Sequence, residues 1–251
     1  MHLHFLGTAG YHPNELRHTS CVLLPDASPD DAFVLDAGTG FFRLTAPDLT
    51  LPRRTHIFLS HAHLDHVAGL TFLLDVLHVH PTQITLYADA HTLDAVKNGL
   101  FNSPLFPLDF SHPVVEIVPE HAFQVAGVEV NTFPLTHPGG SLAFRFRWPG
   151  GKTLCYVTDT AGDGRYHEFI ADAPDVLIHE RNFPDRFGEL ADASGHCTSA
   201  ALVAAARASG AKQVLVTHFN PLTTTDPLLE DDVYTQLPGV VGAFDGLQIE
   251  F

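Results

Sequence analysis

The segment Ile57-Phe58-Leu59-Ser60-His61-Ala62-His63-Leu64-Asp65-His66-Val67-Ala68-Gly69-Leu70 decides the fold. It opens as a buried apolar strand, and three histidines and one aspartate follow that strand within a few positions. Alternate residues of an extended chain point the same way, so we expect His61, His63 and Asp65 to face one site. His66 lies where the chain turns into the next predicted helix. Imidazole and carboxylate groups are ligands that suit zinc, so this spacing predicts a metal site.

This His-x-His-x-Asp-His segment resembles the signature of the metallo-β-lactamase superfamily. The resemblance implies an α/β fold, the αββα four-layer sandwich, and three further ligands that each follow a strand. The chain supplies a histidine, an aspartate and a histidine in the implied order, at His137, Asp159 and His218. The family pattern assigns one ion to His61, His63 and His137, a second ion to Asp65, His66 and His218, and a bridging position to Asp159.

The cofactors implied by this ligand set are two divalent metal ions, zinc first, with manganese or iron as alternatives. Two ions about 3.5–4 Å apart can share a hydroxide, which then acts as the nucleophile of a hydrolysis. Asp65 is counted among the catalytic residues as well as among the ligands. A flavodiiron redox protein is disfavoured because that branch carries glutamate at the position of His63. A single-iron oxygenase is disfavoured because all seven ligands are present.

The rest of the chain alternates strand-like and helical runs, which fits one domain over residues 1–251 with two mixed sheets. Short β-branched or aromatic runs predict strands at 2–6, 20–24, 33–36, 55–60, 84–88, 114–118, 128–135, 141–148, 153–158, 175–179, 214–217 and 247–251. Helices are predicted at 67–79, 91–100, 165–171 and 199–209. The turn Pro149-Gly150-Gly151-Lys152 predicts a hairpin between two of these strands.

Three further segments resemble the ribonuclease Z-like branch, which includes tRNA 3′-processing enzymes and small phosphodiesterases. They are Gly7-Thr8-Ala9-Gly10 with Pro13, Arg17 and Ser20; Leu177-Ile178-His179-Glu180-Arg181; and Ser194-Gly195-His196-Cys197-Thr198-Ser199. The branch implies that Glu180 orients His196 as the proton donor to the leaving oxygen. The alternative is that His196 only caps the helix that follows.

Three departures from the branch bear on the substrate. Cys197 stands where the branch has serine, and Arg181-Asn182-Phe183 replaces the Ala-Thr-Phe of tRNA processors. The interval from His137 to Asp159 has room for one hairpin and no long arm that could grip tRNA. Arg17 and Arg181 are candidates for binding a phosphate, or else for ordinary ion pairs.

The formal net charge of −16 repels polyanions, so nucleic acid is a disfavoured partner and a small anionic phosphodiester is the preferred substrate. The alternatives are a ribonuclease Z-type endonuclease, a lactone, thioester or sulfate-ester hydrolase, and a non-catalytic metal-binding regulator. The three cysteines are expected to be reduced and buried. We see no secretory segment and no apolar stretch of membrane-spanning length, so a cytoplasmic location and no membrane partner are expected. The apolar segment 102–108 would permit a homodimer.

Overall fold

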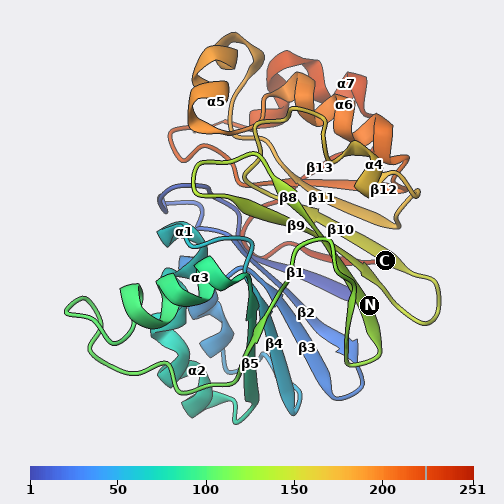
Figure 1. Cartoon of the computed structure of the whole chain (residues 1–251). Coiled ribbons are helices and arrows are strands. Elements are labelled where there is room, and N and C mark those ends of the chain that lie inside the picture. The colour runs from blue at the N-terminus through green and yellow to red at the C-terminus, as the bar shows by residue number, and fades with distance from the viewer. Residues whose placement is uncertain (224) are drawn as a thin grey trace. The chain divides into compact units, whose positions relative to one another are not determined.

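The computed structural model describes residues 1–223 and 225–251. The chain divides into two compact units, the first made of Met1–Val118 with Phe244–Phe251 and the second of Pro119–Ala243. Each unit has its own seven-stranded mixed sheet and its own helices (Figure 1). The predicted α/β class is therefore confirmed, whereas the single domain over residues 1–251 stays a prediction.

The sheet of the first unit has the order β14-β1-β2-β3-β4-β5-β6. Its strands are β1 (His2–Gly7), β2 (Cys21–Ser28), β3 (Asp31–Leu35), β4 (Arg54–Phe58), β5 (Gln83–Ala88), β6 (Val114–Glu116) and β14 (Gln248–Glu250). Strands β3, β4, β5 and β6 pair in parallel, so their carboxyl ends lie at one edge of the sheet. The metal-binding segment predicted from the sequence begins where β4 ends.

The helices of the first unit cover one face of this sheet (Figure 1). They are η1 (Thr39–Thr45), α1 (Leu64–Val67), η2 (Ala68–Phe72), α2 (Leu73–Val79), α3 (Ala90–Asp94) and the π-helical turn η3 (Ala95–Leu100). Fully buried residues from both layers, such as Val34, Ile57 and Leu86 of the sheet and Phe41, Leu70 and Val76 of the helices, form a single apolar cluster. Burial of this surface is the main force that holds the helices on the sheet.

The helix predicted at residues 67–79 is broken in the structure into α1, η2 and α2. The N–H of Gly69 donates to the carbonyl of Ala37 at 2.7 Å, in the loop after β3, rather than to a carbonyl of its own helix. The N–H of Ala37 in turn donates to the carbonyl of His66 at 2.7 Å. A Cβ atom on Gly69 would lie 2.2 Å from the carbonyl oxygen of Gly38, so the close approach requires glycine. These contacts fix α1 against the end of β3.

The sheet of the second unit has the order β13-β12-β11-β10-β9-β8-β7. Its strands are β7 (Phe123–Val125), β8 (Val128–Leu135), β9 (Ser141–Arg147), β10 (Thr153–Val157), β11 (Val176–Glu180), β12 (Gln213–Thr217) and β13 (Val241–Gly242). Strands β9 and β10 form the predicted hairpin, whose turn is closed by a hydrogen bond from Trp148 N to Lys152 O at 2.9 Å. Strands β10, β11 and β12 are parallel neighbours, so their carboxyl ends also meet at one edge.

The sequence predicted both ends of one helix of the second unit correctly. Helix α6 (Ser199–Ser209) begins after Thr198, whose hydroxyl accepts a hydrogen bond from Ala201 N, and ends at Gly210 in the left-handed conformation. The others are α4 (His167–Ile170), η4 (Asp185–Phe187), α5 (Gly188–Ser194), η5 (Pro227–Asp232) and α7 (Val233–Gln236). The sequence did not predict β7, β13, α5 or α7, because segments this short carry too little periodicity.

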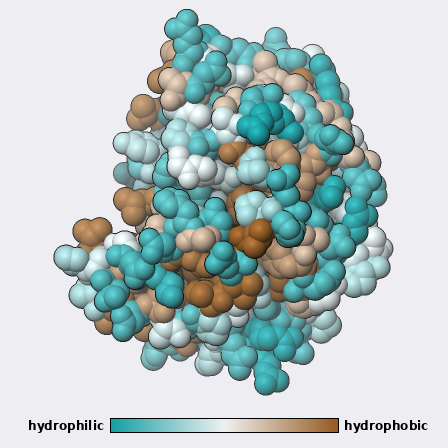
Figure 2. All heavy atoms as spheres, viewed as in Figure 1, coloured by the Kyte–Doolittle hydropathy of each residue, from teal (hydrophilic) through white to brown (hydrophobic). Residues whose placement is uncertain are grey.

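Hydrophobic residues gather in the lower half of the view in Figure 2. The exposed large apolar side chains of the first unit include Leu74, Leu105 and Leu108. Phe106, in the same Pro-rich segment, instead packs against the buried core. Among the described residues, none of the helices combines the length and apolar character that a membrane crossing requires.

Candidate metal centre

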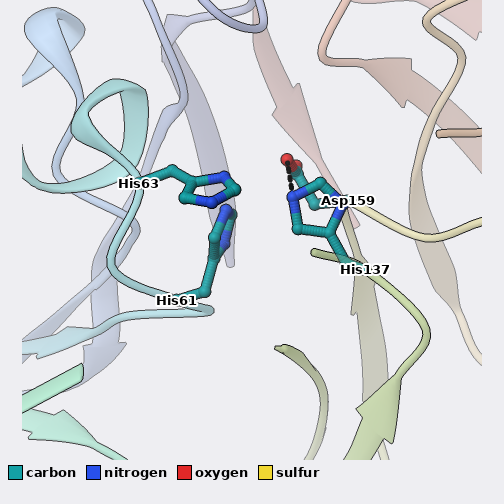
Figure 3. Close-up of side chains that lie close together, drawn as sticks. All are labelled: His61, His63, His137 and Asp159. Carbon is teal, nitrogen blue, oxygen red and sulfur yellow. Dashed lines mark ion pairs between the residues drawn. The ribbon is translucent and has the colours of Figure 1, made fainter. Parts of the chain in front are cut away.

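The second unit brings three of the predicted ligands together. His137 follows β8, Asp159 follows β10 and His218 follows β12. One oxygen of Asp159, Oδ1, lies 3.1 Å from His218 Nε2, and the other, Oδ2, lies 3.5 Å from His137 Nε2. Figure 3 marks the second of these pairs with a dashed line. The carboxylate thus contacts one histidine with each of its oxygens, which is the arrangement that a bridging ligand needs.

The backbone at these strand ends is strained. Asp159 has φ of 49° and His218 has φ of 56°, both in the left-handed region that non-glycine residues rarely adopt. Strain of this kind persists where the surrounding structure imposes it, and it gathers at functional sites. Both residues lie just beyond the ends of β10 and β12, where their side chains approach each other.

The surroundings of the two His137 ring nitrogens suit a cation beside Nε2. Its Nδ1 lies 2.9 Å from the carbonyl oxygen of Gly195, which can only accept, so Nδ1 carries the proton. In a neutral imidazole ring Nε2 then carries a lone pair, and this nitrogen faces the Asp159 carboxylate. Burial lowers the pKa of His137, and the nearby Asp159 only partly offsets this effect. A metal ion between Nε2 and the carboxylate satisfies both acceptors, so the donor set fits a divalent cation.

Gly195 is required at this position for steric reasons. It has φ of 72°, and a Cβ atom there would lie 2.4 Å from Pro138 Cδ and 3.1 Å from His137 Nδ1. Any larger residue would displace the ring that its carbonyl orients. The glycine therefore fixes His137 through both contact and hydrogen bonding.

The first unit holds the other four predicted ligands close to one another. The ring centroids of His61 and His63 are 4.5 Å apart, and Figure 3 shows the two rings edge to face. The rings of His61 and His66 are 4.3 Å apart. Asp65 Oδ2 lies 3.3 Å from His66 Nε2 and accepts a hydrogen bond from the backbone N–H of Tyr11 at 2.6 Å. The prediction that Asp65 belongs to the extended segment is wrong, because α1 begins at Leu64 and Asp65 lies in its first turn.

Asp36, which the sequence did not predict, organises this cluster. It is fully buried after β3 and accepts hydrogen bonds from Ser60 N at 2.7 Å, from Ser60 Oγ at 2.9 Å and from His66 Nδ1 at 2.9 Å. Since Asp36 holds the Nδ1 proton of His66, Nε2 presents its lone pair toward Asp65. Ser60 Oγ also lies 3.0 Å from His61 Nδ1. This is the outer support that metal-binding histidines usually have. The only sequence signal for it is an aspartate directly after a buried strand.

The predicted acid pair also lies together in the second unit. His196 Nδ1 is 3.2 Å from Glu180 Oε2, and the Glu180 carboxylate is fully buried at the end of β11. Glu180 Oε1 accepts a hydrogen bond from Thr160 N at 2.6 Å. The His196 ring stacks on the His218 ring with centroids 5.3 Å apart. Helix capping is carried out by Thr198, so His196 is available for another role.

Burial decides two questions that the sequence left open, namely the role of Arg181 and the state of the cysteines. Arg181 is fully buried, donates to Ser199 Oγ at 2.9 Å and pairs with Glu230 and Asp231, so its charge is used within the fold. Cys21, Cys155 and Cys197 are free and buried as expected, and burial raises the pKa of each thiol.

Comparison with known proteins identifies the family. The model of the beta-lactamase superfamily domain matches residues 23–219. A ribonuclease Z of Pseudomonas putida is 27% identical over 282 aligned positions, which cover 90% of this chain and 87% of that protein. Because the alignment is longer than this chain of 251 residues, the relative has insertions that this chain lacks.

Solved structures share the fold over the whole chain. The metallo-β-lactamase fold protein YhfI of Bacillus subtilis superposes with a TM-score of 0.80 at 22% identity, covering 100% of this chain and 98% of YhfI. The short form of human tRNase Z gives a TM-score of 0.76 at 24% identity, covering 100% of this chain and 99% of that protein. The predicted fold is thereby confirmed. The chain belongs to the beta-lactamase superfamily, and it has the metallo-β-lactamase fold.

Proposed function

We propose that the protein is a dinuclear metal-dependent phosphodiesterase that acts on a small phosphodiester. The observation that carries this proposal is the Asp159 carboxylate, which offers one oxygen to His137 and the other to His218. The proposal assigns His61, His63 and His137 to one ion, Asp65, His66 and His218 to the other, and Asp159 to both. Zinc is the preferred ion, because imidazole and carboxylate ligands suit it.

When bound, the two ions would supply Lewis acidity toward the phosphoryl oxygens and would ionise a water molecule near neutral pH. The chain's own residues would do the rest. Asp36 and the carbonyl of Gly195 hold the rings of His66 and His137 in the orientation that presents Nε2. His196, held by Glu180, would give a proton to the leaving oxygen as the phosphorus–oxygen bond breaks.

Three observations favour a phosphodiester over other esters. The curated relatives carry the names ribonuclease Z and ribonuclease BN, and a ribonuclease cleaves phosphodiester bonds. A phosphodiester carries negative charge, which a cationic centre within an acidic chain would attract locally. The alcohol that leaves a phosphodiester needs a proton, and His196 with Glu180 would form a proton donor of the required kind.

A ribonuclease Z-type endonuclease that processes tRNA is the second candidate, favoured by the 27% identity to the ribonuclease Z of Pseudomonas putida. Two observations make it the lesser candidate. The net charge of −16 opposes binding of a long polyanion. Between His137 and Asp159 the chain forms the β9–β10 hairpin and no arm beyond it.

The test is an activity screen with the metal content measured in parallel. Purified protein would be assayed on bis-p-nitrophenyl phosphate, on cyclic and linear dinucleotides, on a lactone and a thioester, and on a precursor tRNA with a 3′ trailer. We expect turnover of the small phosphodiesters, loss of that turnover with EDTA, and two metal ions per chain. Efficient cleavage of the tRNA trailer would promote the second candidate. Metal at full occupancy without turnover of any substrate would show a binding protein instead.

A further inference from the structure

A pocket of about 400 Å³ opens in the second unit beside the proposed proton donor. Its walls come from the segment that follows β11, from η4, from α5 and from the segment that follows β12. The lining residues that matter here are Asn182, Phe183, Arg186, Phe187, Leu190 and Asn220. The volume falls within the range of about 300–1,000 Å³ that is usual for pockets that bind small organic molecules.

One wall residue of the pocket, Phe183, lies near the acid pair. The ring of Phe183 is 6.3 Å from the ring of His196, measured between centroids. Asn182 Nδ2 donates to the carbonyl of His218 at 3.2 Å, and Asn220 Nδ2 donates to Asn182 Oδ1 at 3.3 Å. These two side-chain amides thus connect His218, a proposed metal ligand, to the pocket wall. A group bound against Phe183 would therefore lie close to His196.

The pocket lining mixes apolar with polar side chains, and its two charged residues, Arg186 and Glu230, carry opposite signs. Phe187 is 45% exposed and Leu190 is 53% exposed, so both present apolar surface to a molecule bound in the pocket. The guanidinium of Arg186 lies over the Phe187 ring, 4.8 Å from its centroid. Arg186 also pairs with Glu230 at 3.3 Å, so its charge is balanced within the pocket wall. Such a surface favours stacking of a planar, uncharged ring over binding of a phosphate.

We propose that this pocket binds the alcohol that leaves from the phosphodiester, and that it selects an alcohol bearing a planar, uncharged ring such as an aryl group or a nucleoside. The inference rests on the proposed function, since it needs an ester oxygen that departs beside His196. In the reaction a water molecule loses one proton to solvent as its oxygen bonds to phosphorus, and the bond from phosphorus to the ester oxygen breaks. His196 gives its proton to the ester oxygen as that oxygen leaves. The products are a phosphomonoester and the alcohol, and the alcohol stays in the pocket until it is released.

The test compares Phe187→Ala and Phe187→Leu with wild-type protein in its metal-loaded form. The matched control is Phe42→Ala, because Phe42 is 39% exposed and also lies beneath an arginine, with Arg43 at 5.3 Å from its ring centroid. Two experiments are run. Steady-state kinetics give KM and kcat for bis-p-nitrophenyl phosphate, and saturation-transfer NMR gives the binding of adenosine, uridine and p-nitrophenol. Loss of ring stacking corresponds to about 5–150-fold weaker binding.

We expect Phe187→Ala to raise the KM and the dissociation constants of the ring compounds by about tenfold, with kcat changed by less than about twofold. Phe187→Leu should fall between wild type and Phe187→Ala, and Phe42→Ala should match wild type. Turnover with an unchanged KM in Phe187→Ala, or ring compounds that bind equally to that variant, overturns the pocket and leaves the proposed function standing. Ring binding that depends on Phe187 without turnover of any phosphodiester keeps the ring site and overturns the phosphodiesterase.

Discussion

Replacing His196 gives the sharpest test of the proposed chemistry, because the loss should depend on the leaving group. His196 Nδ1 lies 3.2 Å from the buried carboxylate of Glu180, which would hold the ring as a proton donor. General acid catalysis usually contributes about 10²–10⁴-fold in rate, which corresponds to about 3–5 kcal/mol of transition-state stabilisation. p-Nitrophenolate leaves without a proton near neutral pH, whereas the alkoxide of a nucleoside does not.

We therefore expect His196→Ala to lower kcat by about 10²–10⁴-fold on a cyclic nucleotide or a dinucleotide and by less than about tenfold on bis-p-nitrophenyl phosphate. His196→Asn should behave in the same way, since an amide can still donate a hydrogen bond to Glu180 but has no proton to transfer. The matched control is His121→Ala. His121 is an exposed histidine of the same unit, and its Nδ1 lies 3.1 Å from the carbonyl oxygen of Pro119.

The assay pairs steady-state kinetics on both substrates with metal analysis of each variant. Metal content should be unchanged in both His196 variants, because His196 is not one of the proposed ligands. Equal losses on both leaving groups, or a fall in bound metal that tracks the loss of rate, would refute the role as proton donor. His196 would then act on the site only through its packing against His218.

The remaining predictions concern metal affinity, stability and thiol reactivity. Asp36→Asn should weaken zinc binding by about 10–100-fold, since the carboxylate orients His66, and competition with a chromophoric chelator measures it; unchanged affinity would contradict this. Arg54 lowers the pKa of the Asp31 carboxyl. The stabilisation of the fold by the Asp31–Arg54 ion pair is therefore complete above about pH 4 and is lost as pH falls through the folded pKa of Asp31. Asp31→Asn should accordingly cost about 2–4 kcal/mol in urea unfolding of the metal-free chain at pH 7, and less at pH 3, whereas a cost independent of pH would argue against the ion pair. The thiol of Cys197 should resist iodoacetamide at pH 7.5 until the chain is unfolded, because burial raises its pKa, and rapid labelling of native protein, detected by mass spectrometry, would show that reasoning to be wrong.

The sequence by itself indicated the fold class, and its resemblance to a known family supplied the seven proposed metal ligands. Part of the reason is local: His61, His137, Asp159 and His218 each lie shortly after an apolar strand, and parallel strands of one sheet place their carboxyl ends at one edge. The spacing of His61, His63, Asp65 and His66 carries the family signature within a few residues. The β9–β10 hairpin and helix α6 were predictable for the same reason, since a glycine turn and a glycine cap mark their ends.

Only the tertiary structure decided what supports and surrounds those ligands. Asp36 orients His66 across 30 positions of sequence, and Gly195 orients His137 across 58, and no local pattern announces either contact. The break of the predicted helix at Gly69 depends on a hydrogen bond to Ala37 from a different part of the chain. The pocket beside His196 is assembled from segments after β11 and β12, whose parallel pairing brings them together. Periodicity and motifs report what a residue does to its sequence neighbours, whereas hydrogen bonds and packing between distant segments exist only once the sheets have formed.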